Sequence, residues 1–167
     1  MEVARVRALR GPNLWSRRTC IEAVVHCTEQ ERDLSLQPEF LKRLRALYPQ
    51  LQVLPVPDGG VPRSAAHVLE IATLSLQADA GCPVSFSRCG ATPEAGVFQV
   101  VVEYSEESVG RAALEIAERL VVATLTGQAF DAEAEIAGLR ELDEEERLGP
   151  STGAIVAAAV ERGIPYR

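Results

Sequence analysis

The residues best suited to chemistry are His67 and Glu70, in the segment AAHVLEIATLSLQ. Three residues apart on a helix, an imidazole and a carboxylate share one face, where they can bind a metal ion or share a proton. A hydrolytic zinc helix of the H-x-x-E-H type needs a second histidine directly after the glutamate, and this chain has Ile71 there. A catalytic zinc ion needs about three protein ligands. We therefore expect no metal and no catalysis at this helix, and we interpret His67 as a structural residue.

The first eighteen residues form a basic segment. They contain Arg5, Arg7, Arg10, Arg17 and Arg18, although the whole chain has a net charge of −7. The same segment holds the sole tryptophan, in LRGPNLW, whereas residues 103–147 carry most of the acids. Such a surface is suited to an anionic or zwitterionic partner, and a simply solvated face explains it equally well. The overall acidity argues against nucleic-acid binding.

Two further patterns support only weak hypotheses. Cys20, Cys27, Cys82 and Cys89 form two C-x6-C pairs, wider than the spacing of structural zinc sites, so we expect free thiols. If Cys20 and Cys27 share a strand, their odd separation places them on opposite faces. The segment Gly149-Pro150-Ser151-Thr152 can hold an anion at a helix start, although helix capping explains it as well. The sequence has no Walker loop, dinucleotide fingerprint or nucleophile elbow, and we expect no cofactor in this domain.

Apolar periodicity and turn residues predict the order of strands and helices. Alternation over 1–10, a turn at 11–13 and a β-branched run over 19–27 predict a hairpin. Further strands are expected over 52–56, 83–88 and 97–104, the last of them central. Helices are expected over 38–48, 64–80, 106–125, 131–142 and 154–162, with Ser64, Ser105 and either Ser151 or Thr152 as N-caps of the second, third and last. This order predicts an α+β fold in two layers, with a mixed or antiparallel sheet of about four to five strands and helices packed mainly on one face.

The length and composition favour one ordinary globular domain. A chain of 167 residues can bury one sizeable core. No apolar run approaches the roughly 18 residues of a membrane span, and the N-terminus has no apolar signal region. We therefore predict a cytoplasmic protein with no membrane partner.

Four segments, taken in order, resemble the N-terminal region of bacterial cyanophycin synthetases. They are LRGPNLWS (9–16), GCPVSFSR (81–88), PEAGVFQVVVEYSEESVGRAALE (93–115) and ELDEEERLGPSTGAIVAAAVERGIPY (141–166). The opening motif, the G-V-F-Q-V-V-V-E-Y strand and the L-G-P-S-T…R-G-I-P ending are specific when taken together. The resemblance is weakest between about residues 28 and 62.

The resemblance implies a place in a larger ligase. Enzymes of this family build multi-L-arginyl-poly-L-aspartate with ATP and Mg²⁺, an ATP-grasp domain adding aspartate and a Mur-ligase-like domain adding arginine. Residues 1–148 would be the N-terminal domain, and 149–167 the linker and first elements leading into an ATP-grasp domain beyond this chain. The implied role is a non-catalytic domain that binds the polymer and contributes to a homo-oligomer.

The resemblance also assigns candidate site residues. The candidates for binding polymer carboxylates are Arg7, Arg10, Arg17, Arg18 and Arg63, because guanidinium and carboxylate groups form paired hydrogen bonds. Some relatives carry a complete H-x-x-E-H helix that trims the polymer. Ile71 and Ser75 stand where the second histidine and a later glutamate would fall. His67 and Glu70 are then vestigial, and a metal-dependent trimming hydrolase is the alternative function.

Overall fold

A four-stranded antiparallel sheet forms one layer of the domain. The computed structural model describes residues 1–34, 37–51 and 64–161. The strands are β1 (Glu2–Leu9), β2 (Cys20–His26), β3 (Ser87–Ala91) and β4 (Val97–Glu103). They pair in the order β1-β2-β4-β3, and every pairing is antiparallel. The predicted N-terminal hairpin and the central position of the strand near 97–104 are confirmed.

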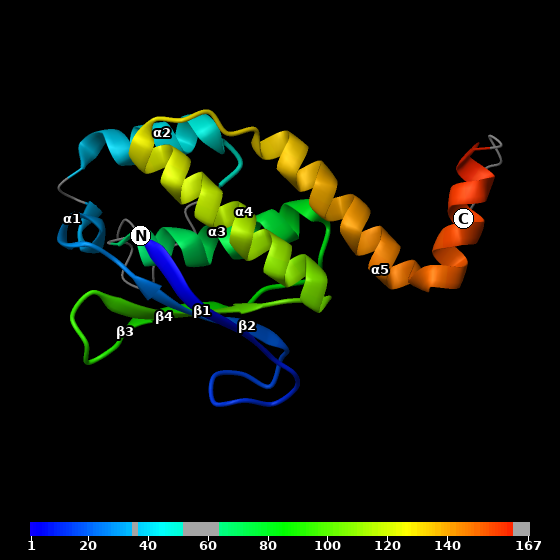
Figure 1. Cartoon of the computed structure of the whole chain (residues 1–167), viewed down its shortest axis with the longest axis horizontal. Helices are drawn as coiled ribbons and strands as arrows, with labels where there is room; N and C mark the ends of the chain where they lie inside the picture. The colour runs from blue at the N-terminus through cyan, green and yellow to red at the C-terminus, as the bar shows by residue number, and fades with distance from the viewer. Residues whose placement is uncertain (35–36, 52–63, 162–167) are drawn as a thin grey trace.

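The helices form the second layer, on one side of the sheet (Figure 1). They are α1 (Glu29–Arg32), α2 (Pro38–Leu47), α3 (Ala65–Ala80), α4 (Glu107–Thr126) and α5 (Ala132–Glu161). α3 packs on β4 and β3, α4 packs on β2 and beside α3, and α2 and α5 contact this pair. The predicted α+β class is confirmed. No helix in the described part of the chain is long and apolar enough to cross a membrane.

Side-chain alternation separates a helix-facing side of the sheet from an open face, the side away from the helices. On β2, Ile21, Ala23 and Val25 join the hydrophobic core, so Glu22 and the other even-numbered residues point to the open face. Cys27 also packs in the core, whereas Cys20 at the start of β2 does not. The two cysteines therefore lie on opposite faces, as predicted, and all four thiols are free.

The third strand begins later in the chain than predicted. The expected range was 83–88, and β3 runs over Ser87–Ala91. Pro83 has no N–H to donate to a ladder, and the N–H groups of Ser85 and Phe86 donate to the Glu103 side chain. The N–H groups of Ser85 and Phe86 are therefore occupied by a carboxylate, and the regular ladder starts after these two residues.

The helix ends require several corrections. Ser64 is the N-cap of α3, as predicted, and Gly81 ends that helix in the left-handed conformation at φ 101°. The N-cap of α4 is Glu106 and not Ser105, since Glu106 has extended backbone angles and its carbonyl accepts from the N–H of Gly110.

The C-terminal helices also differ from the prediction. The two helices expected over 131–142 and 154–162 form α5, interrupted by a non-helical Gly149 at φ 69° and ψ 164°. Ser151 and Thr152 lie within that helix, so their prediction as caps is wrong. α1 was not predicted; its four residues are too few for a periodic signal. The strand expected over 52–56 lies outside the described residues.

Candidate functional site

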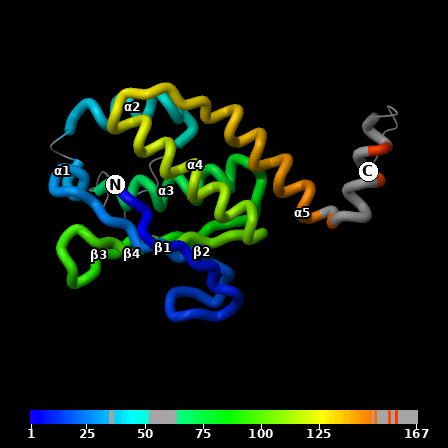
Figure 2. The backbone as a smooth tube through the Cα atoms, viewed as in Figure 1, coloured from blue at the N-terminus to red at the C-terminus, as the bar shows by residue number. Residues whose placement is uncertain are grey.

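The loop between β1 and β2 folds over the open face of the sheet (Figure 2). Asn13 holds its shape, because the side-chain oxygen accepts from the N–H groups of Trp15 at 2.9 Å and Ser16 at 3.0 Å. The side-chain nitrogen of Asn13 donates to the carbonyls of Gly11 at 3.1 Å and Arg18 at 2.9 Å. One amide side chain thus closes the Gly-Pro-Asn turn and fixes where Trp15 points.

Beneath this loop lies a buried carboxylate, Glu22, which is 1% exposed. It accepts from Nε of Arg7, from the indole N–H of Trp15 at 3.2 Å and from the side-chain nitrogen of Gln99. The hydrogen bond from Arg7 lowers the pKa of Glu22, and the same contact raises the pKa of Arg7. Glu22 is therefore ionised at neutral pH, and it orients a half-exposed cation.

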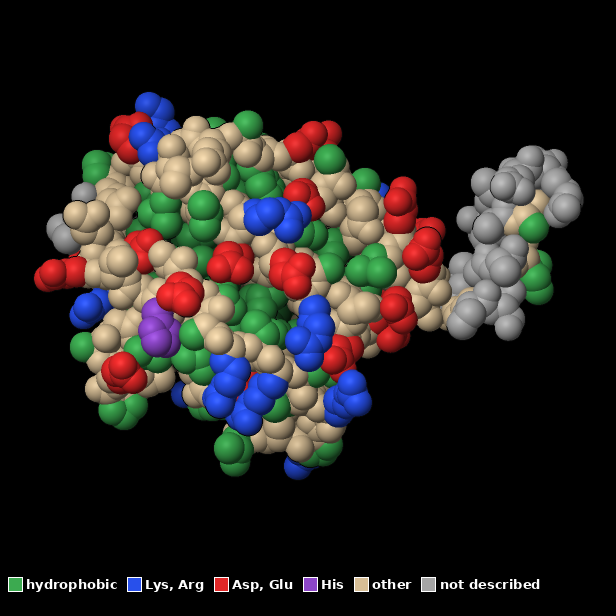
Figure 3. Space-filling model, in the orientation of Figure 1, with side chains coloured by type: hydrophobic (Ala, Val, Ile, Leu, Met, Phe, Trp, Pro, Cys, Tyr) green, Lys and Arg blue, Asp and Glu red, His purple; other side chains and the backbone are tan. Residues whose placement is uncertain are grey.

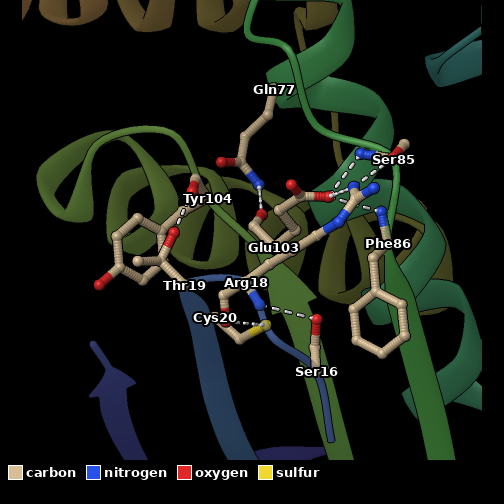
Figure 4. A network of polar contacts seen from close by, with 9 residues as sticks. All are labelled: Ser16, Arg18, Thr19, Cys20, Gln77, Ser85, Phe86, Glu103 and Tyr104. Carbon is tan, nitrogen blue, oxygen red and sulfur yellow. Dashed lines mark hydrogen bonds and ion pairs between the residues drawn. The ribbon is translucent and has the colours of Figure 1, made fainter. Parts of the chain in front are cut away.

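A second carboxylate on the open face, Glu103, anchors another arginine (Figure 4). Its Oε2 accepts from Arg18 at 2.6 Å and from the N–H groups of Ser85 at 2.8 Å and Phe86 at 2.9 Å. Burial alone would raise the pKa of Glu103, but the donated hydrogen bonds outweigh it and lower that pKa. Arg18 also donates to the hydroxyl of Ser85 at 2.5 Å, so it ties the loop to the segment before β3 as well as to the end of β4.

The remaining predicted arginines are not gathered at one point. Arg10 turns toward the helical layer and pairs with Glu107 of α4 at 2.7 Å. Arg17 is exposed and makes no ion pair with the described residues. Arg63 lies outside the described residues. In the view of Figure 3, basic side chains gather over the hairpin side of the molecule and acidic ones over the helical layer.

Sequence reasoning missed three members of this cluster: Glu22, Glu103 and Arg88. The guanidinium carbon of Arg88 lies 5.4 Å from the centre of the Trp15 ring, a cation–π distance. The glutamates did leave a signal, because Glu22 interrupts the apolar run TCIEAVVHC and Glu103 ends the run VFQVVVE. A charge in such a run is either buried with a partner or at an open sheet face. The contribution of Arg88 depends on tertiary contacts that leave no such mark.

His67 and Glu70 are used by separate structural contacts. Nδ1 of His67 lies 2.8 Å from the hydroxyl of Ser64, and its ring meets Phe98 edge-on. Glu70 accepts from the hydroxyl of Ser87 at 2.7 Å, and burial raises the pKa of its carboxyl group. Among the described residues, no three histidine, cysteine or acidic side chains form a group that could hold a metal ion. The trimming-hydrolase alternative therefore finds no support in this geometry.

The open face holds two arginine guanidinium groups in fixed positions. Two arginines rest on buried, ionised carboxylates, and each keeps guanidinium nitrogens that bond to nothing within the described residues. Such groups can bind an anion in pairs of charge-assisted hydrogen bonds.

Comparison with known proteins decides the family. The family model for the cyanophycin synthase-like N-terminal domain matches residues 24–126, more than half of the chain. The chain belongs to this family. The matched range of the cyanophycin synthase-like N-terminal domain begins within β2 and ends with α4, so it covers the end of β2, all of β3 and β4, and both helices that pack on the sheet.

Curated relatives of this cyanophycin synthase-like domain agree. The chain is 34% identical over 181 residues to the cyanophycin synthetases of Trichormus variabilis and of a Nostoc species, and 31% identical over 184 residues to that of Geminocystis herdmanii. Each alignment covers 99% of this chain but only 20% or 21% of the relative. The chain thus spans about a fifth of the length of these relatives.

Proposed function

We propose that this chain is the N-terminal, polymer-binding domain of a cyanophycin synthetase and that it is itself non-catalytic. The observation that carries the proposal is the pair of arginines, Arg7 and Arg18, each fixed on a buried carboxylate of the open face. Each unit of multi-L-arginyl-poly-L-aspartate has a free carboxylate, which matches these cations in charge and in hydrogen-bonding geometry.

The parent enzyme supplies the chemistry in this proposal. ATP and Mg²⁺ belong to an ATP-grasp domain and a Mur-ligase-like domain of the same chain, since this sequence contains no phosphate-binding glycine loop. Residues 149–167 are the connection to the first of them. The domain also contributes to a cytoplasmic homo-oligomer, in which several copies keep polymer near the ligase sites by raising its effective concentration.

Binding to soluble cyanophycin fragments tests the proposal. We expect affinity that falls as salt rises, because exposed ion pairs contribute only about 0–1 kcal/mol each and are screened. The double variant Arg7→Gln/Arg18→Gln should bind at least about tenfold more weakly, a loss of about 1.4 kcal/mol. Arg119→Gln is the matched control, because Arg119 pairs with Glu135 in the helical layer. No binding by the unaltered domain at low salt would contradict the proposal.

A further inference from the structure

One row of residues crosses all four strands on the open face. Arg7 of β1 stands opposite Glu22 of β2, Glu22 opposite Val101 of β4, and Val101 opposite Arg88 of β3. Trp15 bonds to Glu22 and lies against Arg88, so its ring crosses β4 at Val101. Val101 is 0% exposed although no helix covers that face, which is consistent with such a cover. Arg7, Trp15 and Arg88 therefore form a raised wall across the sheet.

The adjacent row is open on β3, where it has a glycine. It consists of Arg5, Val24, Gln99 and Gly90, again one residue from each strand. A Cβ built on Gly90 would meet nothing within 4 Å, so the space above β3 is empty at this point. The Gln99 side chain turns toward Glu22 and so toward the wall. We call this row the trough; four strands spaced about 4.8 Å apart give it a length of about 14 Å.

The charges that face the trough are mostly positive. Arg5 stands at the β1 end, is exposed and has no bonded partner among the described residues. Arg7 and Arg88 stand in the wall, at the β1 and β3 ends. The acid of the wall, Glu22, is buried and already neutralised by Arg7. On the far side, the row of Glu2 and His26 adds one exposed carboxylate near the β1 end.

We propose that Arg7, at the β1 end of the trough, holds the free α-carboxylate of one unit of the polymer, and that an adjacent arginyl-aspartyl unit lies in the trough with the α-carboxylate of its arginine held by Arg88 at the β3 end. The methylene groups of that unit lie over Val24 and Gly90, beside the Trp15 ring. Glu22 acts as a positioning residue, because it fixes Arg7 and the indole without touching the ligand. The inference rests on the proposed function and deepens it, and it brings Arg88, Trp15 and Gly90 into the site.

Filling the trough is the sharpest test. Gly90→Val adds a side chain in open space on a strand, where a β-branched residue is well tolerated. Gly138→Val is the matched control, since Gly138 of α5 also has nothing within 4 Å of a built Cβ and lies away from the sheet. Binding of soluble cyanophycin fragments is measured by sedimentation, and the fluorescence of Trp15, the sole tryptophan, is followed in the same samples. Circular dichroism verifies that both variants are folded.

We expect the fragments to change Trp15 fluorescence saturably in the unaltered protein and in Gly138→Val. Gly90→Val should bind at least about tenfold more weakly. Equal binding to all three proteins would overturn the trough and leave the proposed function standing. If none of the three proteins bound the fragments in the sedimentation experiment, the proposed function would be overturned, and the inference with it.

A separate competition experiment tests which chemical group of the ligand the site recognises. β-Aspartyl-arginine should compete with the fragments for the Trp15 signal, and β-aspartyl-agmatine, which lacks the arginine α-carboxylate, should not; in both compounds the aspartyl α-carboxyl group is an amide, as in the polymer. Equal competition by both compounds would overturn recognition of the carboxylate. The variant Arg88→Gln should remove the difference between the two competitors, because Arg88 is the residue proposed to hold the arginine α-carboxylate of the unit in the trough.

Discussion

Three glutamates, in the sheet and on the helix beside it, are nearly buried, and their neighbours shift the pKa values of their carboxyl groups in opposite directions. Glu22 and Glu103 receive hydrogen bonds from arginines and from N–H groups, which lower the pKa of each carboxyl group. Glu70 receives one hydroxyl hydrogen bond from Ser87, and burial raises its pKa. A buried carboxylate without a cation is unfavourable when ionised. The open face therefore stabilises an ionised carboxylate, whereas the core side of the sheet destabilises one.

The variant Glu22→Gln should lose unfolding free energy at pH 7, by about 1–2 kcal/mol, because the amide cannot pair with Arg7. The folded-state pKa of Glu22 lies below the unfolded value of about 4.3. Its contribution is therefore present above that pH and is lost as pH falls through the folded-state pKa. Urea denaturation should show the deficit shrinking as the pH falls below about 5. A deficit independent of pH would contradict the ion pair as its cause.

Glu70→Gln is the matched control of opposite sign. The folded-state pKa of Glu70 is raised, so its ionised form costs stability above that pKa, and the cost disappears as pH falls through it. Glutamine keeps an acceptor for Ser87 and removes the buried charge. This variant should gain on the order of 1 kcal/mol at pH 7, with the gain shrinking toward acid. A loss of stability at pH 7 would mean that Glu70 has an unrecognised cationic partner.

At the scale of elements, the first turn of α4 is closely packed against the end of β4 and the sheet. A Cβ on Gly110 would come within 2.6 Å of Cβ of Tyr104 and 3.2 Å of Cγ1 of Ile21. Tyr104 is buried at the end of β4, and Ile21 is in the core of β2. Glycine at position 110 thus lets the first turn of α4 lie directly on the sheet, which fixes the helix relative to the open-face site beneath.

The variant Gly110→Ala should therefore be destabilised, by about 1–3 kcal/mol, because backbone or helix must shift to relieve the contact. Gly138→Ala on α5 is the control, since that position has open space and alanine favours a helix by about 0.5–1 kcal/mol over glycine. Urea denaturation of both variants measures the difference. If Gly110→Ala gained stability as Gly138→Ala should, the close contact between α4 and the sheet would be contradicted.

The sequence predicted these elements better than it predicted the site. Period-two alternation located β1, a β-branched run located β2, and Pro38, Ser64 and Gly81 marked helix ends, because these signals are local. The start of β3 was missed because the Glu103 side chain competes for the N–H groups of Ser85 and Phe86, and Glu103 is distant in sequence. The same reason hid Arg88, whose partner Trp15 lies on a loop far from it in the chain. Arg7 and Arg18 were proposed from the basic N-terminal segment and the family resemblance, whereas their buried carboxylate partners needed the register of the strands.

At the scale of the whole molecule, the core residues that the structure describes lie before the last part of α5. α5 contributes Ile136 and Leu139 to the core, and Arg140 donates to the carbonyl of Asp79 at the end of α3. Asp143 is the last described residue that is buried, and Ile155 is 70% exposed. Figure 1 shows α5 leading away from the sheet, and Gly149 breaks its helical geometry. This arrangement suits a domain body at 1–148 followed by a connecting segment.

A chain truncated after residue 148 should therefore keep its thermal midpoint within about 2 °C of the 167-residue chain, since it keeps the described core. Truncation after Ala134 is the matched control, because it removes Ile136 and Leu139 and should cost several kcal/mol, about 2–5 for each large core side chain lost. Differential scanning calorimetry at one salt concentration measures both. A fall of more than about 5 °C for the first truncation, roughly 2 kcal/mol in a domain of this size, would show that residues 149–167 pack on the body of the domain.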